Sequence, residues 1–356
     1  MNRYIGIDGG GTKTAAVLFD EEGRMLAQHV TGPCNPNVLG FDKSAALVKE
    51  CVEALTLGEP RFVAGVADGT KSVPHVDGIY IGTAGIFTAD DGPRFAAAVS
   101  AACGVEKVKC ENDVMNVIAS ATDADRCVAG VSGTGMIIYA KERDRVTRLD
   151  GWGYLLGLGG SGYDIGRDVI RAALGEVEGT AAATALTSLV ELKAGMTLER
   201  LVLEVYRREP AFIASFAPLA FEADAAGDMI ARDILVANAR AFAKVLNHAA
   251  IAFDCGNTVV VSGGIATNVR FGELLAQGLN EGLRLIVPSC PQVVGACINC
   301  ARFCGLDPLA GRVIHNALRR FEDKQIFRGS CKTFFDGRVE RVDLDTEMFQ
   351  LAHDAA

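Results

Sequence analysis

The 356-residue sequence has little that would mark a nucleic-acid-binding or a membrane protein. Its formal net charge is −9, whereas proteins that follow nucleic-acid phosphates usually carry a basic face. It has no run of about 18 apolar residues of the kind that spans a membrane. Asp8 interrupts the apolar N-terminal stretch before it reaches the length of a signal peptide. We therefore expect a cytoplasmic protein with no nucleic-acid or membrane partner.

Signatures of metal centres and hydrolases are also scarce. The five His residues form no H-x-H or H-x-x-x-H pair, and G-x-S-x-G and Walker A motifs are absent. The eleven Cys residues are scattered, as expected of small buried residues in a reducing compartment. Cys297, Cys300 and Cys304 recur at helical spacing and, with Cys290, predict the packed face of a helix. The alternative, a metal or iron–sulfur cluster, would need four converging ligands.

Two segments of the chain repeat one pattern of strands and turns. Residues 4–30 predict a strand, a GGGTKT turn, a second strand, a charged turn and a third strand. Residues 126–149 predict the same order, with SGTG and KERD as the turns. We interpret this pattern as an internal duplication; the alternative is two unrelated hairpins.

The rest of the chain mixes helices with strands, which predicts an α/β fold. Helices are expected at 44–55, 92–103, 114–121, 268–278 and 292–303, strands at 78–82, 107–110, 258–262 and 283–287, and a long helical stretch from about 164 to 246. We expect an N-terminal domain at 1–113, a C-terminal domain at 114–305, and an extension at 306–356 that packs on either domain. The extension predicts a helix at 311–322, a hairpin around FFDGRVERV and a final helix.

The first candidate site is DGGGTKT, an acid followed by three glycines and two hydroxyls. Glycine lets backbone N–H groups approach phosphate oxygens closely, which we expect of Gly10 and Gly11. Thr12 and Thr14 add hydroxyl donors. Asp8, at the end of a buried strand, is suited to hold Mg²⁺ through waters. The pattern predicts a nucleoside triphosphate site, and the alternative is a plain glycine turn.

Two further glycine turns extend this hypothesis. The SGTG turn, with Thr134 at its tip, matches the first turn, and together they are expected to clamp one triphosphate. Gly263 and Gly264 follow a β-branched strand and precede a helix that begins near Asn268. Backbone at such a turn can lie flat against a nucleoside. The alternative for this third turn is an ordinary strand-to-helix connection.

Asp113 lies where a strand gives way to a helix. There it predicts a general base for a hydroxyl that attacks the γ-phosphate, or else the N-cap of the helix. Trp152, the single Trp, follows the second repeat and either packs in a core or contacts the substrate. Gly157, Gly159 and Gly162 spell G-x-G-x-x-G, but neither a long preceding strand nor a βαβ unit is predicted. A dinucleotide site is therefore disfavoured.

IGIDGGGTKT, SGTG, the GWG segment, SGGIATN and PQVVGA, in this order, resemble the N-acetylglucosamine kinase group and the wider BadF/BadG/BcrA/BcrD-type ATPases. Both groups belong to the sugar kinase–heat-shock protein 70–actin superfamily, and the likeness spans about residues 4–304. The resemblance implies two duplicated ribonuclease-H-like (actin-like ATPase) domains with a central nucleotide cleft that binds ATP and Mg²⁺. It also implies a small-molecule substrate, a sugar; we further expect a homodimer.

The resemblance also implies roles for single residues. Asp8 would bind Mg²⁺, Asp113 would be the general base and contact the substrate, and Asn35 in GPCNPN would bind the sugar. Gly85 and Trp152 are further expected substrate contacts. The expected nucleotide-binding residues are Gly10, Gly11, Thr12, Lys13, Thr14, Gly133, Thr134, Gly135, Gly227 in GDMIAR, Gly263, Gly264 and Asn268.

Two departures from the sugar kinases concern the acceptor. After G-W-G those kinases carry Gly-Asp-Glu-Gly-Ser, where this chain has Gly157-Leu-Gly-Gly-Ser161; after the second turn they carry Ser-Asn, where Met136 and Ile137 stand here. Losing polar partners of a substrate hydroxyl is costly. We therefore expect an ATP-dependent phosphotransferase acting on a sugar or sugar-like hydroxyl, with altered specificity. The alternatives are an ATPase of the dehydratase-activator type and a catalytically weak sugar-sensing protein.

Overall fold

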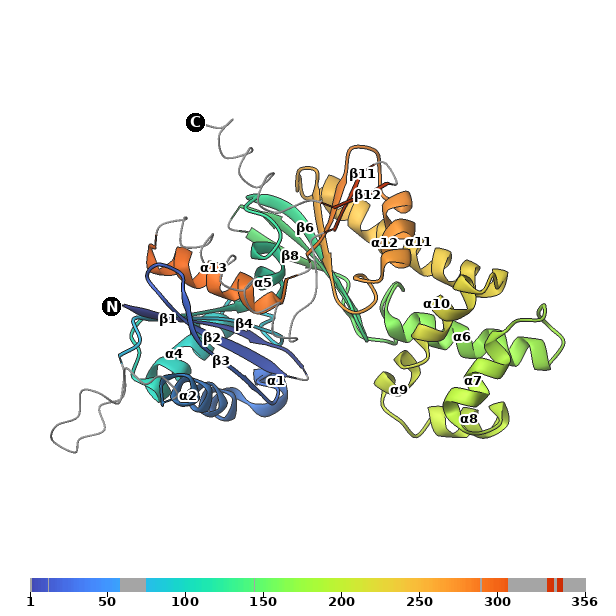
Figure 1. The fold of residues 1–356 in the computed structure, drawn as a ribbon, viewed down its shortest axis with the longest axis horizontal. Coiled ribbons are helices and arrows are strands. Elements are labelled where there is room, and N and C mark those ends of the chain that lie inside the picture. The colour runs from blue at the N-terminus through green and yellow to red at the C-terminus, as the bar shows by residue number, and fades with distance from the viewer. Residues whose placement is uncertain are drawn as a thin grey trace. The chain divides into compact units, whose positions relative to one another are not determined.

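The computed structural model describes residues 2–11, 13–57, 75–143, 145–288 and 290–306, and the backbone of residues 332–335 and 338–341. The chain forms two compact units, Met1–Asp123 with Ser289–Ser330 and Ala124–Pro288 with Cys331–Ala356. Each unit is an α/β body built on its own sheet (Figure 1). The predictions for Thr12, for the helix at 311–322 and for the final helix fall outside the described residues.

The first unit carries a five-stranded sheet in the order β3-β2-β1-β4-β5. Its strands are β1 (Arg3–Gly9), β2 (Thr14–Asp20), β3 (Met25–Thr31), β4 (Gly78–Thr83) and β5 (Val108–Asn112). β2 is antiparallel to β1 and β3, whereas β4 is parallel to both β1 and β5. The carboxyl ends of β1, β4 and β5 therefore meet at one edge of the sheet.

The second unit repeats this strand order. Its sheet runs β12-β11-β10-β9-β6-β7-β8, with β6 (Arg126–Ser132), β7 (Met136–Glu142), β8 (Arg145–Leu149), β9 (Thr258–Ser262), β10 (Arg284–Val287), β11 (Lys332–Phe335) and β12 (Arg338–Arg341). β7 is antiparallel to its neighbours, and β9 is parallel to both β6 and β10. The shared order confirms the duplicated ribonuclease-H-like fold, and the alternative of unrelated hairpins is wrong. β11 and β12 form the hairpin predicted from FFDGRVERV.

Helices cover these sheets close to where the sequence predicts them. The first unit contains α1 (Pro36–Leu39), α2 (Phe41–Leu57), α4 (Asp91–Cys103), α5 (Val114–Ala119) and α13 (Gln292–Cys304). The second contains α6 (Gly162–Val177), α7 (Leu186–Ala194), α8 (Leu198–Val205), α9 (Pro210–Ala214), α10 (Ala217–Ala225), α11 (Met229–Ala252) and α12 (Val269–Gly278). The short helix α1 has no predicted counterpart.

β1 presents alternate residues to two helical layers. Ile5 and Ile7 are fully buried in one core with residues of α2 and α4, whereas Tyr4 and Gly6 face α13. A Cβ on Gly6 would lie 2.6 Å from the backbone nitrogen of Cys297, so glycine is what lets α13 approach this closely. α13 thus belongs to the first unit, although its position in the sequence predicts it for the second. The first unit also extends past the expected boundary at 113.

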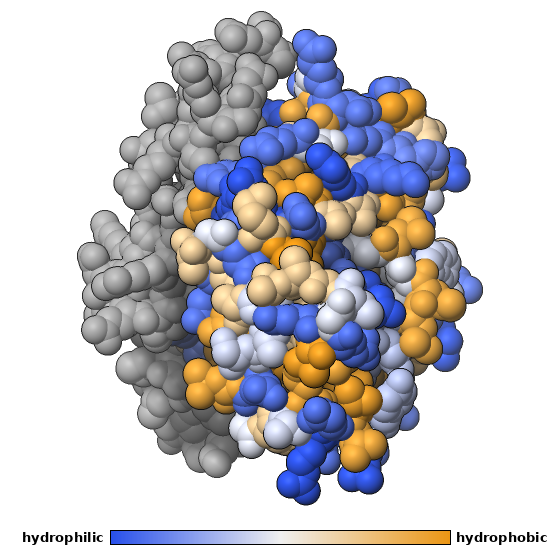
Figure 2. Space-filling model, turned by 90° about the vertical axis from the view of Figure 1, so that its right-hand side faces the viewer, coloured by the Kyte–Doolittle hydropathy of each residue, from blue (hydrophilic) through white to orange (hydrophobic). Residues whose placement is uncertain are grey.

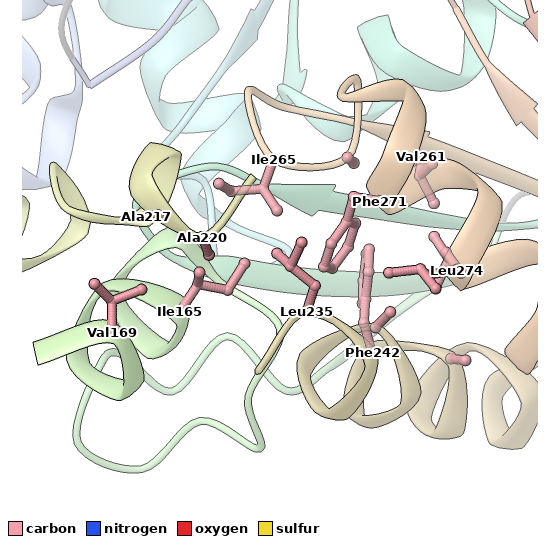
Figure 3. Close-up of a cluster of buried hydrophobic side chains, with 14 of the residues drawn as sticks. Ile165, Val169, Ala217, Ala220, Leu235, Phe242, Val261, Ile265, Phe271 and Leu274 are labelled. Carbon is pink, nitrogen blue, oxygen red and sulfur yellow. The ribbon is translucent and has the colours of Figure 1, made fainter. Parts of the chain in front are cut away.

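The core of the second unit holds α11 against the sheet. Figure 3 shows side chains of α6, α10, α11 and α12 converging beside Val261 of β9. Phe242 of α11 fits under β6 because a Cβ on Gly130 would lie only 2.7 Å from its ring. A Cβ on Gly160 would likewise lie 2.8 Å from the Phe242 Cβ. Burial of such a ring stabilises the fold by roughly 2 kcal/mol and fixes β6 and the start of α6.

The surface is mixed in character. Figure 2 shows hydrophilic and hydrophobic residues interspersed over one face of the molecule. None of the helices in the described part of the chain combines the length and the apolar character needed to cross a bilayer.

Candidate active site

Asp8 occupies the carboxyl end of the central strand of the first unit. It lies on the same side of β1 as Tyr4 and Gly6, because successive strand residues alternate between faces. On that side Asn116 of α5 donates a hydrogen bond of 2.8 Å from Nδ2 to Asp8 Oδ1. Burial raises the pKa of Asp8 to about 6, while the Asn116 hydrogen bond and the Lys13 charge act in the opposite direction.

The turn between β1 and β2 is tight and depends on glycine. The Gly10 N–H donates to the Lys13 carbonyl at 2.9 Å, and a Cβ on Gly9 would lie 2.5 Å from the sulfur of a neighbouring thiol. Gly11 has open space where a side chain would stand, and both Gly11 and Lys13 are exposed. The tip of the turn is therefore accessible to an anion. Thr14 is instead fully buried at the start of β2.

Asp113 lies between β5 and α5, at the same edge of the sheet. The Val114 N–H donates to Asn112 Oδ1 at 3.0 Å, and the Asp113 carboxylate makes no capping hydrogen bond. Asp113 therefore stands at the N-cap position of α5 without a side-chain capping bond, and its role as a general base stays a prediction. Burial raises the pKa of Asp113 to about 7, and repulsion from the Asp8 carboxylate adds to this effect.

Asn35 and Gly85 are neighbours near this edge. Asn35 caps α1, because its Oδ1 accepts from the Asn37 N–H at 2.9 Å. Asn37 Nδ2 in turn donates to the Gly85 carbonyl at 2.7 Å. Gly85 has a φ of +95°, and a Cβ there would overlap Asn35 Oδ1. The structure thus brings together two of the four residues expected to contact the substrate, Asn35 and Gly85, and Asn37 joins them.

In the second unit the SGTG turn is joined to two other segments at Ser132. The Ser132 carbonyl accepts from the Ile265 N–H at 3.0 Å, and Ser132 Oγ donates to the Gly160 carbonyl at 2.6 Å. Two N–H groups at the start of α6 donate to the carbonyls of Gly133 and Thr134, at 2.7 and 3.0 Å. The turn is therefore held by the start of α6 and by the connection after β9.

The SGTG turn and the connection after β9 leave open space beside their backbone. Open space adjoins the Cα atoms of Gly133, Gly135 and Gly264. Gly263 has a φ of +97°, and a Cβ there would overlap the Ser132 carbonyl, so glycine is needed at this position. Asn268 has a structural role as well, because its Oδ1 caps α12 by accepting from the Arg270 N–H at 2.9 Å.

The local backbone conformation also explains why residue 227 is a glycine. Its φ is +91°, and the next residue, Asp228, caps α11 by accepting from the Ala231 N–H at 2.9 Å. The glycine therefore supplies the backbone conformation that leads into this helix.

Trp152 is 62% exposed, so the alternative that it packs in a core is wrong. The Arg148 guanidinium lies 4.7 Å from the centre of its ring and also donates to the Asp150 carbonyl at 3.1 Å. No strand leads directly into α6, and another helix follows it. The G-x-G-x-x-G segment is therefore not part of a βαβ unit.

The cysteine-rich helix is a packed surface, as predicted. Cys297 and Cys300 are fully buried in the core between α13 and the first sheet, whereas Cys290 and Cys304 are half-buried. Within the described ranges no three His, Cys, Asp or Glu side chains are grouped so that they could hold a metal ion.

Asn116 is a candidate site residue that the sequence did not reveal. It is fully buried, and it is the only described side chain that hydrogen-bonds the Asp8 carboxylate. The available signal was weak: one amide in the otherwise apolar helix VMNVIA, three residues after Asp113.

The chain is similar to kinases of amino sugars. It is 34% identical over 68% of its length to an N-acetyl-D-glucosamine kinase of Dictyostelium discoideum, of which 78% is covered. It is 27% identical over 76% of its length to an N-acetylmuramic acid/N-acetylglucosamine kinase of Clostridium acetobutylicum, of which 88% is covered. A solved structure of a candidate N-acetylglucosamine kinase from Chromobacterium violaceum superposes with a TM-score of 0.61 at 24% identity, covering 84% of this chain and 98% of that one.

The family comparison agrees with these relatives. Residues 5–297 match the BadF/BadG/BcrA/BcrD ATPase family. The comparisons confirm the predicted fold and the prediction of an ATP-dependent sugar kinase. This chain belongs to the BadF/BadG/BcrA/BcrD ATPase family.

Proposed function

We propose that the chain transfers the γ-phosphoryl group of ATP to a sugar hydroxyl, with Asp113 as the proton acceptor. One observation carries this proposal: two carboxylates with raised pKa values stand at one sheet edge in different surroundings. Asp8 accepts a hydrogen bond from the Asn116 amide, whereas Asp113 is not used to cap its helix. Such a pair suits two tasks, cation binding and proton acceptance.

The surroundings of Asp8 fit a Mg²⁺ ion. Mg²⁺ retains several waters and takes one or two carboxylates together with phosphate oxygens, so a full cage of protein ligands is not required. Burial is the main cause of the raised pKa values of Asp8 and Asp113, and a bound cation would offset the cost of burying the carboxylate charge. Asp8 would hold the ion; when bound, Mg²⁺ would neutralise charge on the β- and γ-phosphates.

In the proposed reaction a sugar hydroxyl oxygen attacks the γ-phosphorus. A new O–P bond forms, the bond to the β–γ bridging oxygen breaks, and ADP leaves. Asp113 accepts the hydroxyl proton, and its pKa of about 7 makes it a better base than an ordinary aspartate at neutral pH. Asn35, fixed beside Gly85 by Asn37, would orient the sugar.

We assign the nucleotide to the glycine turns. The backbone of Gly10 and Gly11, with Lys13, would contact phosphates. In the second unit the exposed Thr134 and the open backbone beside Gly264 are suited to bind a nucleotide. That one ATP contacts turns of both units remains a prediction, as do a homodimer and roles for Thr12, Thr14, Gly227, Trp152 and Asn268.

A panel of sugars tests the proposed reaction. With MgATP alone we expect slow ADP release, because kinases of this kind limit wasteful hydrolysis by excluding water only after the acceptor binds. One class of sugar should raise ADP release and yield a phosphorylated product, measured by coupled assay and mass spectrometry. Fast hydrolysis that no sugar alters would instead favour an activator-type ATPase, and tight ATP binding with little turnover would favour a sugar sensor.

Within that panel we expect N-acetyl-D-glucosamine to be a poor substrate, with kcat/KM below about 10⁴ M⁻¹s⁻¹. Leu158 is 65% exposed and offers no polar group to a sugar, and Met136 and Ile137 are similarly apolar. Leu158→Asp should improve kcat/KM for this sugar several-fold, whereas Leu155→Asp, in the same loop and 75% exposed, should not. Efficient turnover of N-acetyl-D-glucosamine by the unchanged protein would refute the expected change of specificity.

A further inference from the structure

We propose that Asn116 is a positioning residue that holds the Asp8 carboxylate in the orientation needed to bind Mg²⁺. This inference rests on the proposed kinase reaction, since it assigns a role around the same cation. Asn116 is fully buried, and its Nδ2 donates to Asp8 Oδ1 at 2.8 Å and to the Gly82 carbonyl at 3.3 Å. One amide group therefore ties the carboxylate at the end of β1 to the backbone of β4.

The orientation of this amide is set by its partners. A carboxylate oxygen and a carbonyl oxygen both accept hydrogen bonds, so the NH₂ side of Asn116 must face them. Its Oδ1 is buried and has no hydrogen-bond partner among the described residues. A buried amide oxygen without a partner is costly, which indicates that a donor reaches it in the working enzyme. A water bound beside Asp8 would supply such a donor.

Two glycines make the place for Asn116. A Cβ on Gly82 would overlap its side-chain amide, and a Cβ on Gly295 of α13 would overlap its backbone carbonyl. Neither glycine has a φ in the left-handed region, so backbone conformation does not explain them. Close packing around Asn116 explains both glycines, and the same packing leaves the Asn116 side chain little freedom to turn away from Asp8.

The same helical turn also carries the proposed base. The Asn116 N–H donates to the Asp113 carbonyl at 3.0 Å, and residues three apart lie on one face of a helix. α13 holds this turn in place, because Asn299 Nδ2 donates to the Met115 carbonyl at 3.0 Å. The first turn of α5 therefore sets both the base and, through Asn116, the cation ligand.

The test compares Asn116→Ala and Asn116→Leu with the unchanged protein. Leu keeps most of the volume and removes the donor. Ser120→Ala is the matched control, because Ser120 lies at the end of α5 and its Oγ bonds only the Val117 carbonyl. The first readout is the Mg²⁺ concentration at which ATP gives half of its maximal thermal stabilisation. The second is ATP binding in excess chelator, and the third compares the change in kcat with the change in KM for the sugar.

Loss of a residue that orients a metal ligand typically costs 10–100-fold in metal affinity. We expect both Asn116 variants to raise the Mg²⁺ midpoint by about tenfold or more and to lower kcat, with metal-free ATP binding and sugar KM nearly unchanged. Ser120→Ala should behave as the unchanged protein does.

An unchanged Mg²⁺ midpoint would overturn the proposal. So would an equal loss of metal-free ATP binding, or an equal effect of Ser120→Ala, since either result means a merely structural role. If one Asn116 variant does not fold, Asn116→Ser takes its place. The Mg²⁺ midpoint is read from nucleotide binding, so it remains measurable even if no sugar is phosphorylated and the proposed function fails.

Discussion

Replacing Asp113 by Asn is expected to lower kcat about 100-fold or more while ATP affinity stays nearly constant. The change keeps the shape of the side chain and removes its negative charge and its ability to accept a proton. General-base catalysis contributes about 10²–10⁴-fold, and a loose phosphoryl-transfer transition state favours the low end of that range. α5 should not be disturbed, because its first N–H is bonded by Asn112 and not by Asp113. Steady-state kinetics on the true substrate and ATP titration provide the measurement.

The pH dependence gives this prediction a second readout. A base with a pKa of about 7 must lose its proton to act, so kcat/KM of the unchanged enzyme should fall about tenfold for each step of one pH unit below that value. The residual activity of Asp113→Asn should not show this fall in kcat/KM below pH 7. Asn112→Ala, which weakens the start of the helix and leaves the carboxylate, should keep it. Wild-type turnover by the Asn variant would remove Asp113 from the mechanism.

The strands and glycine turns could be predicted because their signals are local. β1 and β6 show buried runs that end at a glycine turn, and the pattern recurs in the same order. The duplicated fold and the position of Asp8 at a strand end followed from this repeat. Gly263 could likewise be recognised as a turn, although the sequence could not show that the Ser132 carbonyl is what requires glycine there.

Other features depend on contacts between distant segments. α13 follows the second repeat in sequence but packs on β1, and the match between Gly6 and the backbone of Cys297 becomes evident only in the fold. In the sequence Asn116 is a single polar residue in an apolar helix. Its contact with Asp8 becomes evident only in the fold, because the two residues lie 108 positions apart in the sequence. Trp152 was ambiguous because the large side chain of a lone Trp suits a core as well as an exposed loop.

The same Asp113→Asn change is expected to stabilise the protein at neutral pH. Folding raises the pKa of Asp113 from 3.8 to about 7, so the folded state binds this proton more tightly than the unfolded chain does. Its contribution to stability is therefore fully present below about pH 4 and is lost as the pH rises through 7. A tenfold difference in proton affinity between the two states corresponds to about 1.4 kcal/mol. Because the carboxylate is half-buried and solvent screens it, we expect a gain of ~1–3 kcal/mol for the variant at pH 7.5.

Urea unfolding from pH 4 to pH 8, without nucleotide and with excess chelator, measures this difference. The two proteins should differ least near pH 4, close to the unfolded-state pKa of 3.8, and should diverge progressively up to about pH 7. Glu106→Gln, which removes an exposed negative charge from the same unit, should show no such divergence. A variant less stable than the wild type at pH 7.5, or a difference independent of pH, would contradict the prediction. In that case the surroundings of Asp113 would stabilise its charged carboxylate. A residue that is kept for catalysis at the expense of stability is expected instead to destabilise the fold in its charged form.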